Sequence, residues 1–160
     1  MLGGIYPDME KVLAVDFHLP DMFILSGASK FTDPVVKTRF GGNPDYITEA
    51  KILGGYIAKE HPDGKVALIL QNDDFGADGE KGLKQGLEGS NVRIVSREPY
   101  ESLENDLTSQ VQRAKNSGAD VLVAYTLPPQ GANVVKVARQ VLNWDVPIVV
   151  TGFEPLDILQ

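Results

Sequence analysis

The residues whose type and position best suit chemistry are two aspartates, Asp73 and Asp74, which follow the apolar run at residues 66–70. Clustered carboxylates after a buried strand can bind a divalent cation, as they do in phosphoacceptor receiver domains. Such a domain also needs a third aspartate and a lysine at the ends of two later strands, and the segments that follow Thr126 and Thr151 supply neither. We therefore predict that Asp73 and Asp74 form a turn and cap the next helix, and that they bind no metal.

Three glycines follow the aspartates, as glycines do in nucleotide-binding loops. Gly76, Gly79 and Gly82 are three residues apart, whereas a dinucleotide site needs Gly-x-Gly-x-x-Gly at the turn between strand and helix. The carboxylates of Asp78 and Glu80 between them would repel phosphate. The sequence contains no Gly-x-Ser-x-Gly elbow, Walker loop or His-Glu-x-x-His helix. We therefore predict that the protein is not an enzyme and uses no cofactor.

Charge and composition argue against several classes of protein. The chain of 160 residues has a formal net charge of -7, and its 15 lysines and arginines are scattered, which argues against nucleic-acid binding. It has no cysteine and two histidines, so it forms no disulfide and is a poor candidate for a zinc site. No apolar run approaches the ~20 residues that span a bilayer. The first residues lack the pattern of a signal peptide, so we expect a cytosolic protein or a chain that has lost its natural beginning.

Stretches typical of strands alternate with helical patterns along most of the chain. After the run at 66–70, strand-like stretches lie at 92–96, 121–126 and 147–152. The helical patterns between the last three carry apolar residues on one side: Leu103, Leu107, Val111 and Ala114, and then Val134, Val135, Ala138, Val141 and Leu142. This alternation favours an α/β fold, a parallel sheet with helices on both faces in the form of a Rossmann-like lobe. Ligands of such sheets bind beyond the carboxyl ends of the strands. Those ends are expected at residues 71–76, 97–100, 126–130 and 152–157.

The first 45 residues have a different organisation. Pro7 suits the first position of a short helix, and residues 22–25 are typical of a strand. In an α/β fold a parallel strand should precede that helix, but only residues 1–3 could belong to such a strand. We therefore predict that the chain begins in the middle of a domain. Residues 32–45 contain prolines and glycines and have the character of a crossover between two bodies. A helix through residues 47–57 is expected to follow.

Three motifs in order carry a resemblance to a known family. The motifs at residues 25–29 (LSGAS), 72–76 (NDDFG) and 117–122 (SGADVL) resemble those of type I periplasmic binding proteins, in particular the branched-chain amino-acid (Leu/Ile/Val) receptors of ABC importers. The resemblance implies two α/β lobes that close on a small solute for delivery to an ABC permease, outside the cytoplasm and associated with the membrane. Residues 1–36 would then be a remnant of the first lobe. Residues 37–160 would form a second lobe that is incomplete at its C-terminal end.

The resemblance also implies a set of ligand-binding residues. The set is Gly27, Ala28, Ser29, Phe75, Tyr125, Thr126 and Glu154. The segment from Gly27 to Ser29 would hold the α-carboxylate and the amino group of the solute, and Phe75 would pack on it. Glu154 would pair with an ammonium group. Each position also has a structural alternative: a turn after a strand, a residue under its own helix, the core of the sheet, or a solvated loop.

The start of the chain departs from the family pattern. Many members have serine or threonine hydroxyls at the start of a helix in the first lobe, and this chain has Tyr6, Pro7 and Asp8. Proline has no N–H to donate, and the carboxylate of Asp8 would repel the carboxylate of a bound solute. Both features disfavour an α-amino acid as the solute. We therefore expect a small-molecule solute that is an amino acid or a related small organic acid or amide.

Two other classes remain open from the sequence: a small cytosolic flavodoxin-like regulatory or interaction domain, and a cofactor enzyme with an unrecognised site. We also predict that this chain by itself binds solute weakly or not at all. Its first segment is apolar and lacks a covering sheet, so it should self-associate, most simply as a homodimer.

Overall fold

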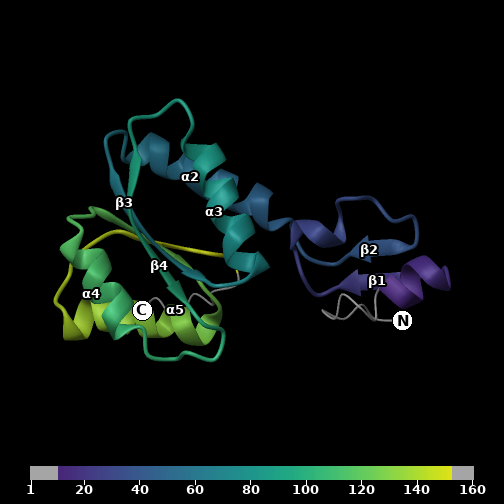
Figure 1. Ribbon diagram of the computed structural model, residues 1–160. Helices are drawn as coiled ribbons and strands as arrows, with labels where there is room; N and C mark the ends of the chain where they lie inside the picture. Colours follow the sequence, from purple (N-terminus) through teal and green to yellow (C-terminus); the bar gives the residue numbers. More distant parts are fainter. Residues whose placement is uncertain (1–10, 153–160) are drawn as a thin grey trace.

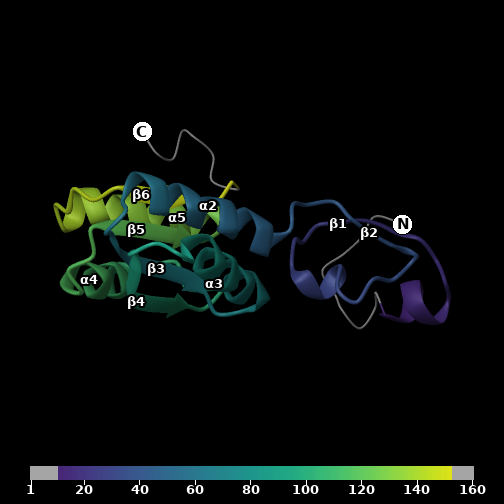
Figure 2. The same cartoon turned by 90° about the horizontal axis from the view of Figure 1, so that it is seen from above.

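The computed structural model describes residues 11–152 of the chain. It contains a small N-terminal body, residues 11–45, and a larger main body that begins at residue 46 (Figures 1 and 2). The short segment 42–45 joins the two bodies.

The main body is built on a four-stranded parallel sheet with the order β4-β3-β5-β6. The strands are β3 (Lys65–Gln71), β4 (Arg93–Tyr100), β5 (Val121–Tyr125) and β6 (Ile148–Val150). β3 lies in the interior of the sheet, with Leu68 opposite Arg97 of β4 and Val123 of β5. Residues 66–70 are all 0% exposed, which explains why the sequence of this strand is a continuous apolar run.

Helices cover both faces of this sheet (Figures 1 and 2). They are α2 (Tyr46–Glu60) and α3 (Asp74–Leu87) on one face, and α4 (Thr108–Asn116), α5 (Pro128–Lys136) and its π-helical continuation η3 (Val137–Val141) on the other. Alternate residues of β3 point to opposite faces. Leu68 belongs to the core with α2 and α3, and Ile69 belongs to the core with α4 and α5. The predicted α/β fold, a parallel sheet with helices on both faces, is confirmed.

The helix after β4 begins later than the sequence suggested. β4 continues to Tyr100, and residues 101–107 form a connection in which Leu103 is 91% exposed. The prediction of a helix through Leu103 is therefore wrong. Asp106 explains the later start, because its side chain accepts hydrogen bonds from the N–H and the hydroxyl of Thr108, at 3.0 and 2.6 Å.

The last helix also departs from the predicted periodicity. Val134 and Ala138 are buried as predicted, but Val141 is 55% exposed and Val137 is buried in its place. The α-helix continues into the π-helical η3, and the wider π turn moves the later side chains around the helix axis.

The N-terminal body contains a parallel pair of strands. β1 (Asp21–Ile24) pairs with β2 (Arg39–Gly41), and the body also contains the helical turns η1 (Lys11–Asp16) and η2 (Ser29–Phe31). β1 confirms the predicted strand, and Pro7, the predicted start of the first helix, lies outside the described residues. The division into two lobes after residue 36 stays a prediction; β2 pairs with β1 before the chain enters α2.

Within residues 11–152, no helix combines the length and apolar character needed to cross a membrane.

Glycines allow α2 and α3 to pack in backbone contact. A Cβ atom at Gly54 would lie 2.6 Å from the carbonyl oxygen of Leu83, and one at Gly82 would lie 2.2 Å from that of Ile47. The obstacles are backbone atoms, so the helices would have to move apart to accept a side chain. This close approach holds α3, which begins just after the carboxyl end of β3, against α2.

Two adjacent glycines of α2 provide a matched test of this contact. We expect Gly54→Ala to lower the free energy of unfolding by about 1–3 kcal/mol, because the added methyl group overpacks the helix interface. Gly55→Ala should instead raise it by about 0.5–1 kcal/mol, since a Cβ there meets nothing within 4 Å and alanine favours helix. Urea unfolding followed by circular dichroism measures both. Equal effects of the two substitutions would contradict the proposed backbone contact.

Candidate functional site

A cleft of about 360 Å³ lies between the N-terminal body and the carboxyl end of β3. Its N-terminal wall consists of residues that follow β1, among them Ala28, Lys30 and Phe31. Its opposite wall consists of the end of β3, the start of α3, the start of α2 and the residue before α5. Gln71, Asp73, Asp74, Phe75, Tyr46 and Leu127 line that side. The cleft therefore lies where the parallel sheet predicted a ligand site.

Aromatic rings form much of the main-body wall. The ring of Phe75 packs edge-on against that of Tyr46, with centroids 4.8 Å apart and an interplanar angle of 68°. On its other side the Phe75 ring packs against Tyr125, at 4.6 Å between centroids. Phe75 is only 6% exposed, yet it lines the cleft, so it is both a core residue and part of the cleft surface. The sequence had left these two roles of Phe75 as alternatives.

Tyr125 lies behind Phe75 and supports it. The residue is 1% exposed, and its hydroxyl oxygen lies 3.1 Å from the carbonyl oxygen of Tyr46 and 3.1 Å from Glu49 Oε2. Burial raises the pKa of the Tyr125 hydroxyl far above its ordinary value, and the nearby Glu49 carboxylate adds to the shift. Tyr125 therefore stays protonated and joins β5 to the start of α2.

The ends of β5 and β6 are joined in the same region. Thr126 is fully buried, and its carbonyl oxygen accepts a hydrogen bond from the hydroxyl of Thr151 at 3.2 Å. Glu49 Oε1 accepts a hydrogen bond from the N–H of Gly152 at 2.6 Å. Neither Tyr125 nor Thr126 lines the cleft. Glu154, the predicted partner of an ammonium group, lies outside the described residues.

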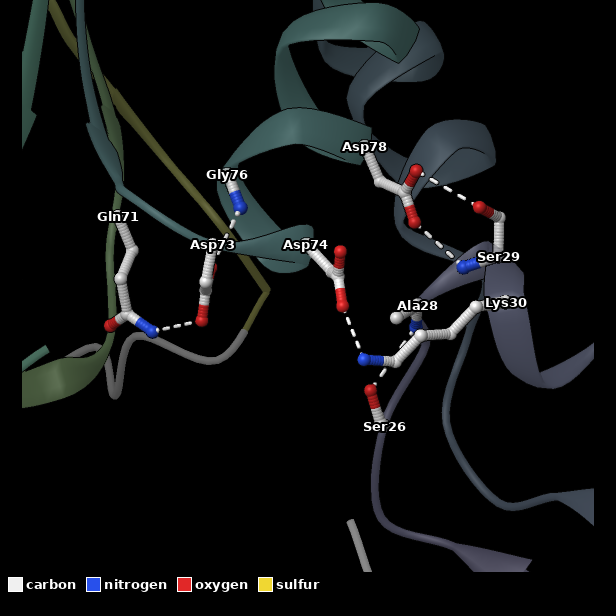
Figure 3. Close-up of polar contacts among 9 residues, drawn as sticks. All are labelled: Ser26, Ala28, Ser29, Lys30, Gln71, Asp73, Asp74, Gly76 and Asp78. Carbon is white, nitrogen blue, oxygen red and sulfur yellow. Dashed lines mark hydrogen bonds and ion pairs between the residues drawn. The ribbon is translucent and has the colours of Figure 1, made fainter. Parts of the chain in front are cut away.

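The segment after β1 contains the other predicted site residues. Ala28 lines the cleft, and Gly27 is buried beside it, where its carbonyl oxygen accepts a hydrogen bond from the N–H of Tyr46 at 3.0 Å. A Cβ atom at Gly27 would lie 1.9 Å from the carbonyl oxygen of Pro44, so this position requires glycine. Ser29 does not line the cleft, and its N–H and hydroxyl donate hydrogen bonds to Asp78 of α3 (Figure 3).

The two aspartates at the start of α3 have separate partners (Figure 3). Asp73 is the N-cap residue: its Oδ1 accepts from the N–H of Gly76 at 3.2 Å, and its Oδ2 accepts from Gln71 Nε2 at 2.5 Å. Asp74 forms an ion pair with Lys30 of the N-terminal body. The predicted capping role of Asp73 is confirmed. In residues 11–152, no cluster of three acidic or histidine side chains could hold a metal ion.

Several cleft residues were not predicted from the sequence. Lys30 and Phe31 directly follow the motif at 25–29, so extending that motif by two residues would have found them. Gln71 is the last residue of β3 and belongs to the predicted carboxyl-end segment. Leu127 likewise belongs to a predicted carboxyl-end segment, residues 126–130. Tyr46 carries no local signal, because only the packing of α2 brings it to the cleft.

A cleft beside the carboxyl ends of a parallel sheet, walled by a second body, is typical of small-molecule binding proteins. The profile of the periplasmic binding protein family matches residues 18–160. The chain therefore belongs to the periplasmic binding protein family, and it has the type I fold that the sequence motifs suggested. This match disfavours the alternative of a flavodoxin-like regulatory domain. No curated protein sequence matches the chain.

Solved structures of the same fold show how much of such a protein the chain spans. A branched-chain amino acid ABC transporter protein from Thermus thermophilus with bound valine has a TM-score of 0.82 at 19% identity, over 99% of this chain and 43% of that chain. A solute-binding protein of an ABC transporter from Rhodopseudomonas palustris BisB5, in complex with 3,4-dihydroxybenzoic acid, has a TM-score of 0.73 at 18% identity. The match covers 92% of this chain and 40% of that chain. A fatty acid ABC transporter substrate-binding protein from Thermomonospora curvata has a TM-score of 0.61 at 19% identity. The match covers 72% of this chain and 30% of that chain. The chain spans less than half the length of these proteins.

The adjacent aspartates allow a matched test of their roles. We expect Asp73→Ala to lower the free energy of unfolding by about 0.5–2 kcal/mol, because the helix loses its N-cap. Asp74→Ala should cost about 0–1 kcal/mol, since it removes only an exposed ion pair. Thermal unfolding measures both, and magnesium should change neither the wild-type nor the variant midpoints. A midpoint that rises with magnesium only when both aspartates are present would restore the cation-site interpretation.

Proposed function

We propose that the protein is a solute-binding receptor of an ABC-type uptake system. The observation that carries this proposal is the cleft of about 360 Å³ at the carboxyl end of β3, with an aromatic wall and a few polar groups. Its volume lies in the range of about 300–1,000 Å³ that is typical of small-molecule sites. Membership of the periplasmic binding protein family supports the same function.

We propose that the solute is an amino acid or a related small organic acid or amide. Phe31, Tyr46 and Phe75 offer an apolar surface for a side chain or ring, and Ser26 and Gln71 bring polar atoms to the same cleft. Proteins of the same fold bind valine and 3,4-dihydroxybenzoic acid. Glu154 completes the proposed site, together with the segment from Gly27 to Ser29.

We also propose that the protein acts in the periplasm or outside the cell, at the membrane, beside an ABC permease, and that it catalyses no reaction. In this proposal residues 1–36 belong to one lobe and residues 37–160 to the other.

Self-association of the chain stays a further prediction. Exposed apolar side chains on the N-terminal body support it: Phe17, Phe23 and Leu25 are 67%, 55% and 68% exposed.

Two leucines on the surface of the main body allow a matched test of the cleft. Leu127 lines the cleft and is 40% exposed, whereas Leu103 is 91% exposed and does not line it. We expect Leu127→Arg to weaken solute binding at least tenfold, because the arginine side chain fills the cleft. Leu103→Arg should bind as the wild type does. Both positions are open to solvent, so both variants should fold.

The measurement is thermal unfolding of the full chain with L-valine, L-leucine, 3,4-dihydroxybenzoate or acetamide, followed by titration calorimetry with any solute that stabilises it. A solute at 100 times its dissociation constant should stabilise the folded state by about 2.7 kcal/mol. Equal affinities in the two arginine variants would place the solute elsewhere. Stabilisation by none of the four solutes would agree with the weak or absent binding expected of this chain by itself, and the same result with the complete two-lobed protein would count against the proposed solute class.

A further inference from the structure

An ion pair connects the two walls of the cleft. Lys30 of the N-terminal body pairs with Asp74 of α3, and both residues line the cleft (Figure 3). The Lys30 ammonium also lies 5.3 Å from the centroid of the Phe31 ring. The side chains of Lys30 and Asp74 are 44% and 59% exposed, so both charges are accessible to a solute.

Among the described residues that line the cleft, the remaining charge belongs to Asp73, and its oxygens are engaged within the main body. They accept hydrogen bonds from the N–H of Gly76 and the side chain of Gln71. Lys30 and Asp74 instead bind each other, and an ion pair at such exposed positions contributes little to stability. These two charges can therefore bind a solute at little cost to the fold.

Ser29, which the resemblance assigned to the head group of the solute, is engaged elsewhere. Its N–H donates to Asp78 Oδ2 at 2.6 Å, and its hydroxyl donates to Asp78 Oδ1 at 3.0 Å. A solute carboxylate could take these donors only from the Asp78 carboxylate, which would then lose them. Lys30, the next residue, is the cation that lines the cleft in the described part of the chain. Lys30 is therefore the better donor for a carboxylate, because its hydrogen bond is charge-assisted.

We propose that the Lys30–Asp74 pair is a charge selector, which favours solutes that carry both a negative and a positive group. The Lys30 ammonium binds the carboxylate of the solute, and the Asp74 carboxylate binds its ammonium group, so the four charges alternate in sign. The inference rests on the proposed function, because it assigns the head group of a solute in the same cleft. An ammonium group donates three hydrogen bonds, which leaves donors for Glu154 as well.

The selector discriminates by repulsion as well as by attraction. A monoanion is attracted by Lys30 but lies beside the Asp74 carboxylate, whose like charge repels it. A cation without a carboxylate is attracted by Asp74 and repelled by Lys30. A zwitterion pairs with both residues and meets no like charge in this pair. L-Valine and L-leucine should therefore bind more tightly than 3,4-dihydroxybenzoate, which carries a carboxylate and no ammonium group.

The experiment compares three solutes of similar shape on the complete two-lobed protein, because this chain by itself is expected to bind solute weakly or not at all. L-Valine carries both charges, 3-methylbutanoate lacks the ammonium group, and L-valinamide lacks the carboxylate. Titration calorimetry at about pH 6 keeps the amine of L-valinamide protonated and the carboxylates ionised. L-Valine should bind about tenfold more tightly than either analogue.

Two substitutions should change these preferences in opposite directions for different solutes. Asp74→Asn removes the like charge, so 3-methylbutanoate should bind about threefold more tightly while L-valine binds about tenfold more weakly. Lys30→Met keeps the apolar stem, and it should strengthen binding of L-valinamide and weaken that of L-valine to similar extents. A general disturbance of the cleft would weaken all three solutes. A gain of affinity for one analogue therefore identifies the effect of the charge.

Matched controls remove a charge of the same sign from an ion pair away from the cleft. Lys84→Met breaks the pair with Glu80, and Asp145→Asn breaks the pair with Arg139. Neither Lys84 nor Asp145 lines the cleft. Both controls should bind the three solutes as the wild type does. Controls that change the preferences as much as Lys30→Met and Asp74→Asn would overturn the selector.

The selector is also overturned if L-valine binds no more tightly than its analogues, if none of the three solutes binds, or if Asp74→Asn and Lys30→Met leave the preferences unchanged. These results separate the selector from the proposed function. Equal binding of L-valine by the wild type and both variants would retain the receptor and remove the selector, as would binding of 3,4-dihydroxybenzoate alone. Binding of none of these solutes by the complete protein would count against both.

Discussion

The rest of the structure depends on the burial of β3 between two layers of helices. Residues 66–70 are inaccessible to solvent, and the strand pairs with β4 on one side and β5 on the other. Burial of these five apolar residues fixes the register of the sheet, because a shift by one residue would exchange the two cores. The strand ends at Gln71, and Asp73 caps the next helix two residues later. The apolar strand therefore determines where the cleft lies.

Contacts in the core of the main body support the aromatic wall of the cleft. Phe75 packs between Tyr46 and Tyr125, and the hydroxyl of Tyr125 lies within hydrogen-bond distance of the start of α2. Glu49 contacts this hydroxyl and also binds the N–H of Gly152 after β6. Three elements far apart in the chain thus support one aromatic surface. Such support lowers the cost of ordering side chains when a solute binds.

The opposite wall is attached differently. Gly27 brings its backbone within hydrogen-bond distance of Tyr46, and η2 reaches α3 through polar contacts at the edge of the cleft. Polar contacts of this kind break and form more readily than a buried core, so this wall is the one suited to movement. One wall of the cleft is thus part of a packed core, whereas the other is held by polar contacts at the edge of the cleft.

The sequence by itself determined the α/β order, the sheet with helices on both faces, the cap at Asp73 and the location of the cleft beyond the strand ends. These features follow from apolar periodicity and from residues close together in the chain, so local rules suffice. Only the tertiary structure decided the partners of the site residues. Ser29 binds Asp78, 49 positions away, and Tyr125 lies behind the cleft instead of lining it. The start of α4 at Thr108 coincides with a turn in which Asp106 accepts hydrogen bonds from Thr108, and the apolar spacing of Leu103 gave no sign of it. Periodicity reports which residues are buried, but the relative placement of helices decides which polar groups meet.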